Sequence, residues 1–415
     1  MTRFVPFLVL LILLFVLPSL LGSYQLGLVQ TALIMALFAT AFNLLSGQAG
    51  MLSFGHAAYF AVGGFGTIYA MKLAEDGTFP IPTPLLPLAG ALVAGLFGVI
   101  AGVFATRRSG VYFSMVTLAI AELLHDIAPA MEGTFGGESG ISSMKMPWLS
   151  FDYGNATQVY YTVLAWVLVG IGILFLYNRT LFGRLTLGLR ESERRLSFLG
   201  FNTHAVKVIV FAVSAALSGL AGGLLVFVNE SINYSAFEMG YSASVVMYTF
   251  VGGASLFLGP ALGAVLFSLL GSLLTDVTQN WLLYQGLIFV FVMMFLKHGL
   301  ADLVARIADE LRAGDWKRLT ERLRQCISGA VAASGIYMLV ELVSAIRGRE
   351  YLAQLTAGGA WPPVRIFATD WLPGHVLTWA LPLFLIAVGS TFCVLLKTGG
   401  NSTSAMSSLT KEAAQ

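Results

Sequence analysis

The sequence from Leu26 to His56 reads LGLVQTALIMALFATAFNLLSGQAGMLSFGH and joins an apolar run to an abruptly polar ending. The run Leu26–Leu45 has about 20 residues, the length that an α-helix needs to cross the hydrocarbon core of a bilayer. Between residues 46 and 56, glycine, serine, glutamine and histidine replace the apolar residues. This stretch predicts a membrane-spanning helix that ends in a break.

The composition of the whole chain also indicates a membrane protein. Charged residues make up 11% of the 415 residues and hydrophobic residues 57%, with a mean hydropathy of +0.82. Soluble domains carry about 25% charged residues, so this chain cannot cover itself with a water-compatible surface. The net charge of +2 gives no indication of nucleic-acid binding. Cys326 and Cys393 lack the spacing of a disulfide framework or a metal site.

Twelve stretches are apolar enough to be considered as membrane spans. They are Phe4–Leu21, Leu26–Leu45, Ala57–Lys72, Leu85–Thr106, Val111–Ala130, Tyr160–Tyr177, Val206–Val228, Ala243–Leu258, Ala261–Leu274, Leu282–Leu296, Ile327–Ile346 and Val376–Leu396. The first stretch has no clear cleavage motif, so we expect a retained span and not a signal peptide. We predict an all-α, polytopic transmembrane helical bundle with about ten core spans plus two extra C-terminal spans.

The basic residues predict the orientation of the chain, because loops rich in Lys and Arg stay in the cytoplasm. With Arg3 inside, counting the spans places three further basic segments inside. It places the loop Met131–Val159, whose single basic residue is Lys145, outside. The inside segments are Arg107–Arg108, Arg179–Lys207 and Lys297–Arg324. Both termini are therefore predicted to be cytoplasmic.

The last quarter of the chain has a different character. Residues 301–326 carry apolar positions at helical spacing opposite charged ones, which predicts amphipathic helices on the cytoplasmic membrane surface. A docking site for a partner is the alternative for these helices. Residues 327–397 predict an extra pair of membrane segments, and the small polar residues 398–415 predict a disordered tail.

Two glycine-rich segments are candidates for a substrate pathway. Non-helical backbone at membrane depth is tolerated only where protein or a water-filled cavity surrounds it, and broken helices often form transporter sites. The alternative is that glycines only allow close helix packing, which accounts for Gly63, Gly64 and Gly66. His56 taken alone would more often be a structural, hydrogen-bonded residue. The predicted pathway residues are Ser46, Gly47, Gly50, Ser53, Gly55 and His56 in the first segment, and Gly252, Gly253 and Gly259 in the second.

A charged segment, Phe182–Asn202, lies between two predicted spans and is predicted to be a short cytoplasmic helix that ends at Gly200. A helix at this position suits a transporter that receives force from a separate motor. A solvated loop is the alternative. The residues predicted to couple to an ATPase are Gly183, Arg184, Arg190, Glu191, Glu193 and Gly200.

The energy source is predicted to lie outside the chain. No Gly-Lys-Ser/Thr occurs, so there is no P-loop for ATP. Glu122 is the one carboxylate predicted deep in a span, and ionisable residues at depth are functional by default. A secondary transporter that uses Glu122 is therefore the alternative to an external ATPase. A membrane-embedded enzyme or scaffold is a third class, but the sequence has no paired acid and base or metal cluster.

These motifs together resemble the LivM-type permease subunits of branched-chain amino acid ABC importers. The likeness covers roughly residues 5–300 and keeps the order of its motifs. They are the N-L-L-x-G-x-x-G-x-x-S-x-G-H-A-A run from Asn43, Thr117-Leu-Ala with Glu122, Thr134–Ser142, Phe182-Gly-Arg, Arg190–Glu193 and Gly259–Ala264.

The resemblance implies a bacterial inner-membrane permease domain over residues 1–300, with no catalytic residue, metal or cofactor of its own. It implies a LivH-like sister permease, two cytoplasmic ATPase subunits that hold ATP and Mg²⁺, and a periplasmic or lipid-anchored substrate-binding protein. The resemblance also implies that the chain contacts membrane lipid and binds no nucleic acid. Close relatives carry urea, short amides or other amino acids, so the substrate stays open.

Three features depart from this family. Arg194 and Arg195 replace residues that are usually apolar or small, Lys297-His298-Gly299 lacks the usual proline, and residues after Leu300 have no counterpart.

Overall fold

The computed structural model describes residues 5–77, 81–149, 152–296, 299–304, 307, 316–358, 361–366 and 369–391. The chain divides into two compact units, Met1–Val304 and Ala305–Gln415, so the division falls close to the predicted domain boundary at residue 300. The predicted disordered tail and Cys393 lie outside the described residues.

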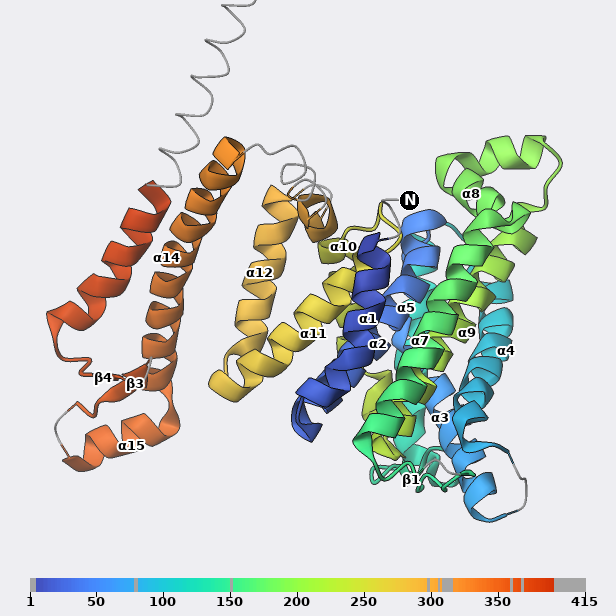
Figure 1. Ribbon diagram of the computed structural model, residues 1–415, viewed down its shortest axis with the longest axis horizontal. Coiled ribbons are helices and arrows are strands. Elements are labelled where there is room, and N and C mark those ends of the chain that lie inside the picture. The colour runs from blue at the N-terminus through green and yellow to red at the C-terminus, as the bar shows by residue number, and fades with distance from the viewer. Residues whose placement is uncertain are drawn as a thin grey trace, which may run out of the picture. The chain divides into compact units, whose positions relative to one another are not determined.

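The first unit is a bundle of α-helices (Figure 1). Its elements are α1 (Val5–Leu20), α2 (Ser23–Asn43), η1 (Leu44–Gln48), α3 (Ala57–Glu75), η2 (Thr83–Leu85), α4 (Leu86–Ala105), α5 (Val111–Ile127), η3 (Ala128–Ala130), α6 (Glu132–Phe135), β1 (Ile141–Ser142), α7 (Ala156–Arg179), α8 (Leu181–Phe198), α9 (Thr203–Asn229), β2 (Ser231–Ile232), η4 (Tyr234–Phe237), α10 (Met239–Gly252), α11 (Gly259–Val277) and α12 (Trp281–Phe295).

Each of the twelve predicted spans overlaps a helix of the described residues, which confirms the polytopic helical fold. Seven described helices are long and apolar enough to cross a membrane, and three shorter apolar helices accompany them. The eighth prediction, Ala243–Leu258, extends too far, because α10 ends at Gly252 and residues 253–258 form a turn before α11. The described residues also form two short pairs of strands, which the all-α prediction did not include.

The helices α2 and α9 are the most buried spans of the first unit. They pack against each other, and α9 also packs along α3 and α4. These contacts rest on glycine, because a methyl group added at Gly63 would overlap the backbone of Gly219, and one added at Gly222 would overlap the carbonyl of Phe60. Close approach of helix backbones through small residues is how helices associate in membranes. The packing explanation for Gly63 is therefore confirmed.

The helix α4 shows the inverse of a soluble amphipathic helix. Its buried residues are mainly small, including Gly90, Ala94 and Gly98. The exposed side chains of Leu92 and Leu96 are large and apolar, with 73% and 66% of their surface accessible. A helix that places small residues inward and large apolar residues outward fits a lipid surrounding.

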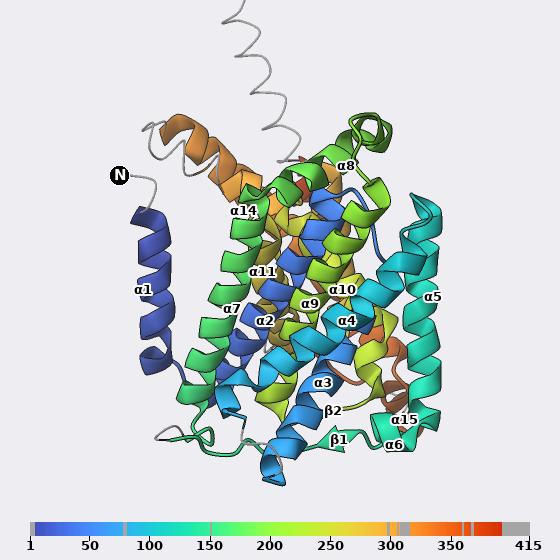
Figure 2. The ribbon, with the colours of Figure 1, turned by 90° about the vertical axis from the view of Figure 1, so that its right-hand side faces the viewer.

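Two of the predicted inside segments, Arg107–Arg108 and Arg179–Lys207, lie at the end of the first unit opposite the predicted outside loop. Figure 2 shows α8 at one end of the bundle and β1, β2 and α6 at the other. Ser109, which follows Arg107–Arg108, hydrogen-bonds to Glu193 of α8, so two predicted inside segments meet. We call the opposite end the outer end.

The second unit contains α14 (Trp316–Arg347), α15 (Arg349–Gly358), β3 (Val364–Ile366), β4 (Thr369–Trp371) and an apolar helix at Val376–Thr391. The predicted boundary at residue 326 falls inside α14, which continues without interruption. Elongating an existing helix costs less than nucleating a new one, so the polar residues before Ile327 extend the apolar span. Ser328 donates a hydrogen bond to the Gly389 carbonyl (2.7 Å), which joins α14 to the last helix.

We predict that Gly222→Ala will destabilise the bundle by about 1–3 kcal/mol, because the new methyl group must push α3 away from α9. The measurement is thermal unfolding of the detergent-solubilised chain. Gly172→Ala is the matched control, since a methyl group at Gly172 of α7 meets nothing within 4 Å. Equal unfolding temperatures for the two variants would contradict the packing described for Gly222.

Candidate functional site

The break predicted after the second span is present in the structure. The α-helix α2 widens into the π-helix η1 at Leu44–Gln48, the chain then runs without regular structure to His56, and α3 begins at Ala57. We call residues 44–56 the break segment. The change in hydrogen bonding is visible at its start, where Ala49 donates to the carbonyl of Leu44 (3.2 Å) and Met51 to that of Leu45 (3.0 Å).

Four side chains from four different helices bond to backbone groups in or beside the break segment. Backbone polar groups at membrane depth need a partner within the protein, because lipid offers none. The donors and acceptors are Ser114 Oγ to the Leu52 carbonyl (2.5 Å), Arg190 Nη1 to the Gly47 carbonyl (2.6 Å), Ser214 Oγ to the Ala41 carbonyl (2.7 Å), and Ala57 N–H to Ser242 Oγ (2.9 Å). The break segment is therefore held from α5, α8, α9 and α10 together.

His56 is fully buried at the start of α3. Its ring stacks on Phe38 and contacts Phe42 edge-on. Since the hydroxyl of Ser214 donates to Ala41, the Nε2 of His56 is the donor to Ser214 Oγ (3.0 Å). This environment favours the structural role for His56, and its pathway role stays a prediction.

The break segment and its surroundings also concentrate unpaired polar atoms. Eight buried side-chain N or O atoms of the described residues have no hydrogen-bond partner there, and six of them lie between residues 43 and 59. Buried polar atoms are normally paired, so such a concentration needs a reason. A route for a polar solute would supply one. The six atoms are Asn43 Oδ1, Ser46 Oγ, Gln48 Oε1, Ser53 Oγ, His56 Nδ1 and Tyr59 OH.

The second glycine-rich segment forms the tight crossing of α10 and α11. A methyl group added at Gly252 would overlap the Gly259 carbonyl, so close packing accounts for these glycines without a pathway. The two glycine-rich segments nevertheless meet, because a methyl carbon at Gly47 would lie 2.9 Å from the Ala254 carbonyl. The structure thus brings the two predicted glycine-rich segments together at Gly47 and Ala254, and Ala254 itself was not a predicted pathway residue.

Glu122 lies apart from these hydrogen bonds. It is half-buried on α5, and no hydrogen bond or ion pair joins it to another described residue. The neighbouring Ala121 approaches Gly55, since a methyl group added there would lie 3.0 Å from the Ala121 Cβ. The residue that approaches the break segment is therefore Ala121, and the role of Glu122 in a pathway stays a prediction.

The predicted short helix between two spans is confirmed as α8, Leu181–Phe198. Gly200 follows it with φ +87°, a left-handed conformation that suits glycine at the end of a helix. Near its start, Gly183 packs against the Tyr177 carbonyl, whereas Arg184 is exposed. Ser192 has an extended backbone (φ −165°, ψ 104°) that divides α8 into two parts.

The second part of α8 is fixed by an ion pair. Glu193 accepts from Lys207 of α9 (2.5 Å), and Lys207 also donates to Ser109 Oγ (2.9 Å). Partial burial would by itself raise the pKa of Glu193, but the hydrogen bond and charge of Lys207 outweigh it and lower that pKa. Glu191, by contrast, forms only an exposed pair with Arg195 (3.8 Å).

The exposed tip of α8 carries large apolar side chains beside basic ones. Phe198 is 90% and Leu199 67% accessible, next to the exposed Arg194 and Arg195. In water this combination is typical of a surface that meets a partner.

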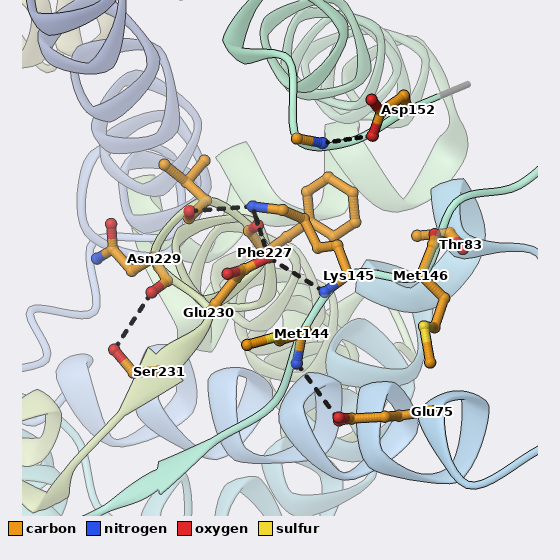
Figure 3. Close-up of polar contacts among 12 residues, drawn as sticks. Glu75, Thr83, Met144, Lys145, Met146, Asp152, Phe227, Asn229, Glu230 and Ser231 are labelled. Carbon is orange, nitrogen blue, oxygen red and sulfur yellow. Dashed lines mark hydrogen bonds and ion pairs between the residues drawn. The ribbon is translucent and has the colours of Figure 1, made fainter.

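The outer end is fastened by Lys145 (Figure 3). Its ammonium group lies 3.3 Å from the Glu230 carboxylate and donates to the carbonyls of Phe227 (2.9 Å) and Val228 at the end of α9. Next to Lys145, Ser143 donates to Glu75 of α3 (2.6 Å). The loop after α6 therefore connects the outer ends of α3 and α9.

Sequence reasoning missed the serines that hold the break segment and the clamp at Lys145. Ser114 and Ser214 are isolated polar residues within predicted spans, and Ser242 directly precedes the predicted span Ala243–Leu258. These positions are the signal that could have marked them. Among the described residues, no group of three or more His, Cys, Asp and Glu side chains could hold a metal ion.

This helical membrane bundle, with its broken span and its helix α8, belongs to a defined class of transport proteins. The family model for the permease component of branched-chain amino acid transport systems matches residues 24–296, so the chain is a member of that family.

Individual relatives agree with this assignment. The high-affinity branched-chain amino acid transport system permease protein LivM of Salmonella typhimurium is 25% identical over 72% of this chain and 75% of its own length. LivM of Escherichia coli is 26% identical over 62% of this chain and 65% of its own length, just under two thirds. The ribose import permease protein RbsC of Haemophilus influenzae is 27% identical over 59% of this chain and 72% of its own. No solved structure matches the chain significantly.

We predict that Glu193→Gln will lower the free energy of unfolding near pH 7 by about 1 kcal/mol, because it leaves the buried Lys207 ammonium without a counter-charge. A carboxylate with a lowered pKa stabilises the fold above its unfolded pKa, and this contribution is lost as the pH falls through the folded pKa. The difference between wild type and variant should therefore shrink below about pH 4.5.

The measurement is thermal unfolding in detergent across this pH range. Glu191→Gln is the control, since both partners of its pair are 73% exposed and its loss should change little. A difference for Glu193→Gln that is constant or grows as the pH falls would rule out the ion pair as its cause.

Proposed function

We propose that this chain is the membrane-spanning permease subunit of an ABC importer that translocates branched-chain or related amino acids by ATP-driven alternating access. Family membership and the LivM relatives support the class of cargo. The sequence has no P-loop, so ATP and Mg²⁺ bind to partner subunits.

The observation that carries this proposal is the position of α8. This helix lies at the end of the bundle that holds the predicted cytoplasmic segments, exposes Phe198 and Leu199, and bonds directly to the break segment through Arg190. An externally driven permease requires a surface helix of this kind. One side of the helix contacts the separate motor, and the other side contacts a polar break in a span.

Membership of the permease family, with LivM and LivH relatives, supports the partners that we propose. A LivH-like sister permease completes the pathway within the membrane lipid, two ATPase subunits dock at α8, and a periplasmic or lipid-anchored binding protein delivers the substrate at the outer end. The chain then resides in a bacterial inner membrane with both termini in the cytoplasm, as the basic loops indicate.

Two alternatives to this proposal differ in the cargo and in the energy source. The same machine could carry urea or short amides, and the ribose permease relative extends the range of cargo in this superfamily to sugars. A secondary transporter would instead use Glu122, which is half-buried on α5.

We expect ATP-dependent uptake of leucine by proteoliposomes that contain this chain, the sister permease, the ATPases and the binding protein encoded with it. The measurement is accumulation of radiolabelled leucine, with urea and ribose as competing cargoes. Uptake should persist when ionophores collapse the proton and sodium gradients, because ATP supplies the energy.

The matched variant is Glu122→Gln, which should retain uptake in an ATP-driven importer. Uptake that needs an ion gradient, proceeds without ATP and is abolished by Glu122→Gln would establish the secondary transporter instead. Uptake of urea or ribose in preference to leucine would retain the importer but replace its cargo.

A further inference from the structure

Arg190 joins α8, where the proposed function places the ATPases, to the break segment. It is the last arginine of the first part of α8, two residues before the interruption at Ser192. Its guanidinium donates to the Gly47 carbonyl over 2.6 Å, although the two residues are 143 positions apart in the sequence.

The Gly47 carbonyl is available because the helix ends one residue later, at Gln48, and the last carbonyls of a helix have no donor within it. In a continuous α-helix it would accept from the N–H of Met51, four residues later. Here the N–H of Met51 donates to Leu45 instead, at 3.0 Å. The Arg190 guanidinium thus takes the place of the missing backbone donor. A charge-assisted bond of this length is stronger than an ordinary amide bond.

The backbone also passes close to Arg190. Gly50 has φ +72°, and a methyl carbon placed on it would lie 3.3 Å from Arg190 Cγ and 3.5 Å from Arg190 Cα. A residue with a side chain would be strained at this φ and would crowd the arginine. The break segment therefore contacts Arg190 on both sides of its turn, at Gly47 and at Gly50.

The two parts of α8 are attached to different elements. The first part reaches the break segment through Arg190, while the second part is joined through Glu193 to Lys207 of α9 and to Ser109. The extended backbone of Ser192 separates them, so no continuous helical hydrogen bonding forces the two parts to move as one.

Arg190 is itself exposed to solvent. Its bond to Gly47 therefore contributes a modest free energy and can break and re-form during a transport cycle.

We infer that Arg190 is a positioning residue that ties the conformation of the break segment to the position of the first part of α8. The inference rests on the proposed function. When the ATPases move α8, Arg190 moves the Gly47 carbonyl, and through it the point at which Gly47 meets Ala254 of the second glycine-rich segment. Hydrolysis and opening of the pathway are thereby linked.

The test compares Arg190→Gln with Arg190→Lys and with Arg108→Gln in the reconstituted importer, measuring substrate transported per ATP hydrolysed. Arg108 is the matched control, because it is an exposed arginine that lies outside α8. Arg190→Gln should assemble and hydrolyse ATP normally but lower this ratio about tenfold, the effect expected for loss of one charge-assisted hydrogen bond. Arg190→Lys should restore part of the ratio, since lysine supplies one donor. Arg108→Gln should leave it unchanged.

A second measurement needs no transport. Hydrogen exchange of the amides in residues 44–51 should be faster in Arg190→Gln than in wild type or Arg108→Gln, because the turn loses the hydrogen bond that the Arg190 guanidinium donates. The inference would be overturned if hydrogen exchange in Arg190→Gln equalled that of wild type. It would also be overturned if Arg190→Gln lowered uptake and ATP hydrolysis in equal proportion, because the ratio of the two would then be unchanged. Failure of Arg190→Gln to bind the ATPases would make it a docking residue and overturn it too. If the wild-type importer transports no substrate with ATP, the proposed function is refuted. The hydrogen-exchange measurement then still shows whether Arg190 holds the conformation of the break segment at Gly47.

Discussion

The requirement that every backbone polar group at membrane depth finds a partner within the protein governs this structure. A continuous span meets it alone, but the span that ends in the break segment does not. Ser114, Arg190, Ser214 and Ser242 supply partners from four helices, so the break can exist only where these helices converge. The position of α8 against the bundle follows from the same requirement, because Arg190 is one of the four.

Glycine has two different uses in this chain. At Gly63, Gly219 and Gly222 it lets helices approach until their backbones touch, which fixes the arrangement of α3, α4 and α9. In the break segment it accompanies a change of backbone conformation, as the positive φ of Gly50 shows. Sequence alone separates these uses by their neighbours, since only the second kind lies among serine, glutamine and histidine.

The sequence was sufficient to predict the membrane class, the break after the second span and the helix α8, because each depends on local composition. The contacts between distant segments were beyond it. Nothing near Arg190 in the sequence points to Gly47, and Lys145 gives no sign of Glu230 until the loop folds back onto α9. The widening at Leu44 was also out of reach, because a π-helix depends on tertiary hydrogen bonds more than on residue preference. Expecting Ala243–Leu258 to be one span failed because the crossing of α10 and α11 at Gly252 outweighs apolar composition.

The clamp at the outer end has an electrostatic consequence. Lys145 is paired with Glu230 and donates to the carbonyls of α9. Its positive charge is therefore balanced by Glu230 and does not neutralise the exposed carboxylates around it. These are Glu75, Asp76, Asp126, Glu132, Glu138, Asp152 and Glu238, and Lys72 is the exposed cation near them among the described residues. The outer end therefore presents a negative potential, which draws cationic surfaces towards it and repels anionic solutes. This field weakens as salt is added, whereas a zwitterion without net charge crosses it largely unaffected.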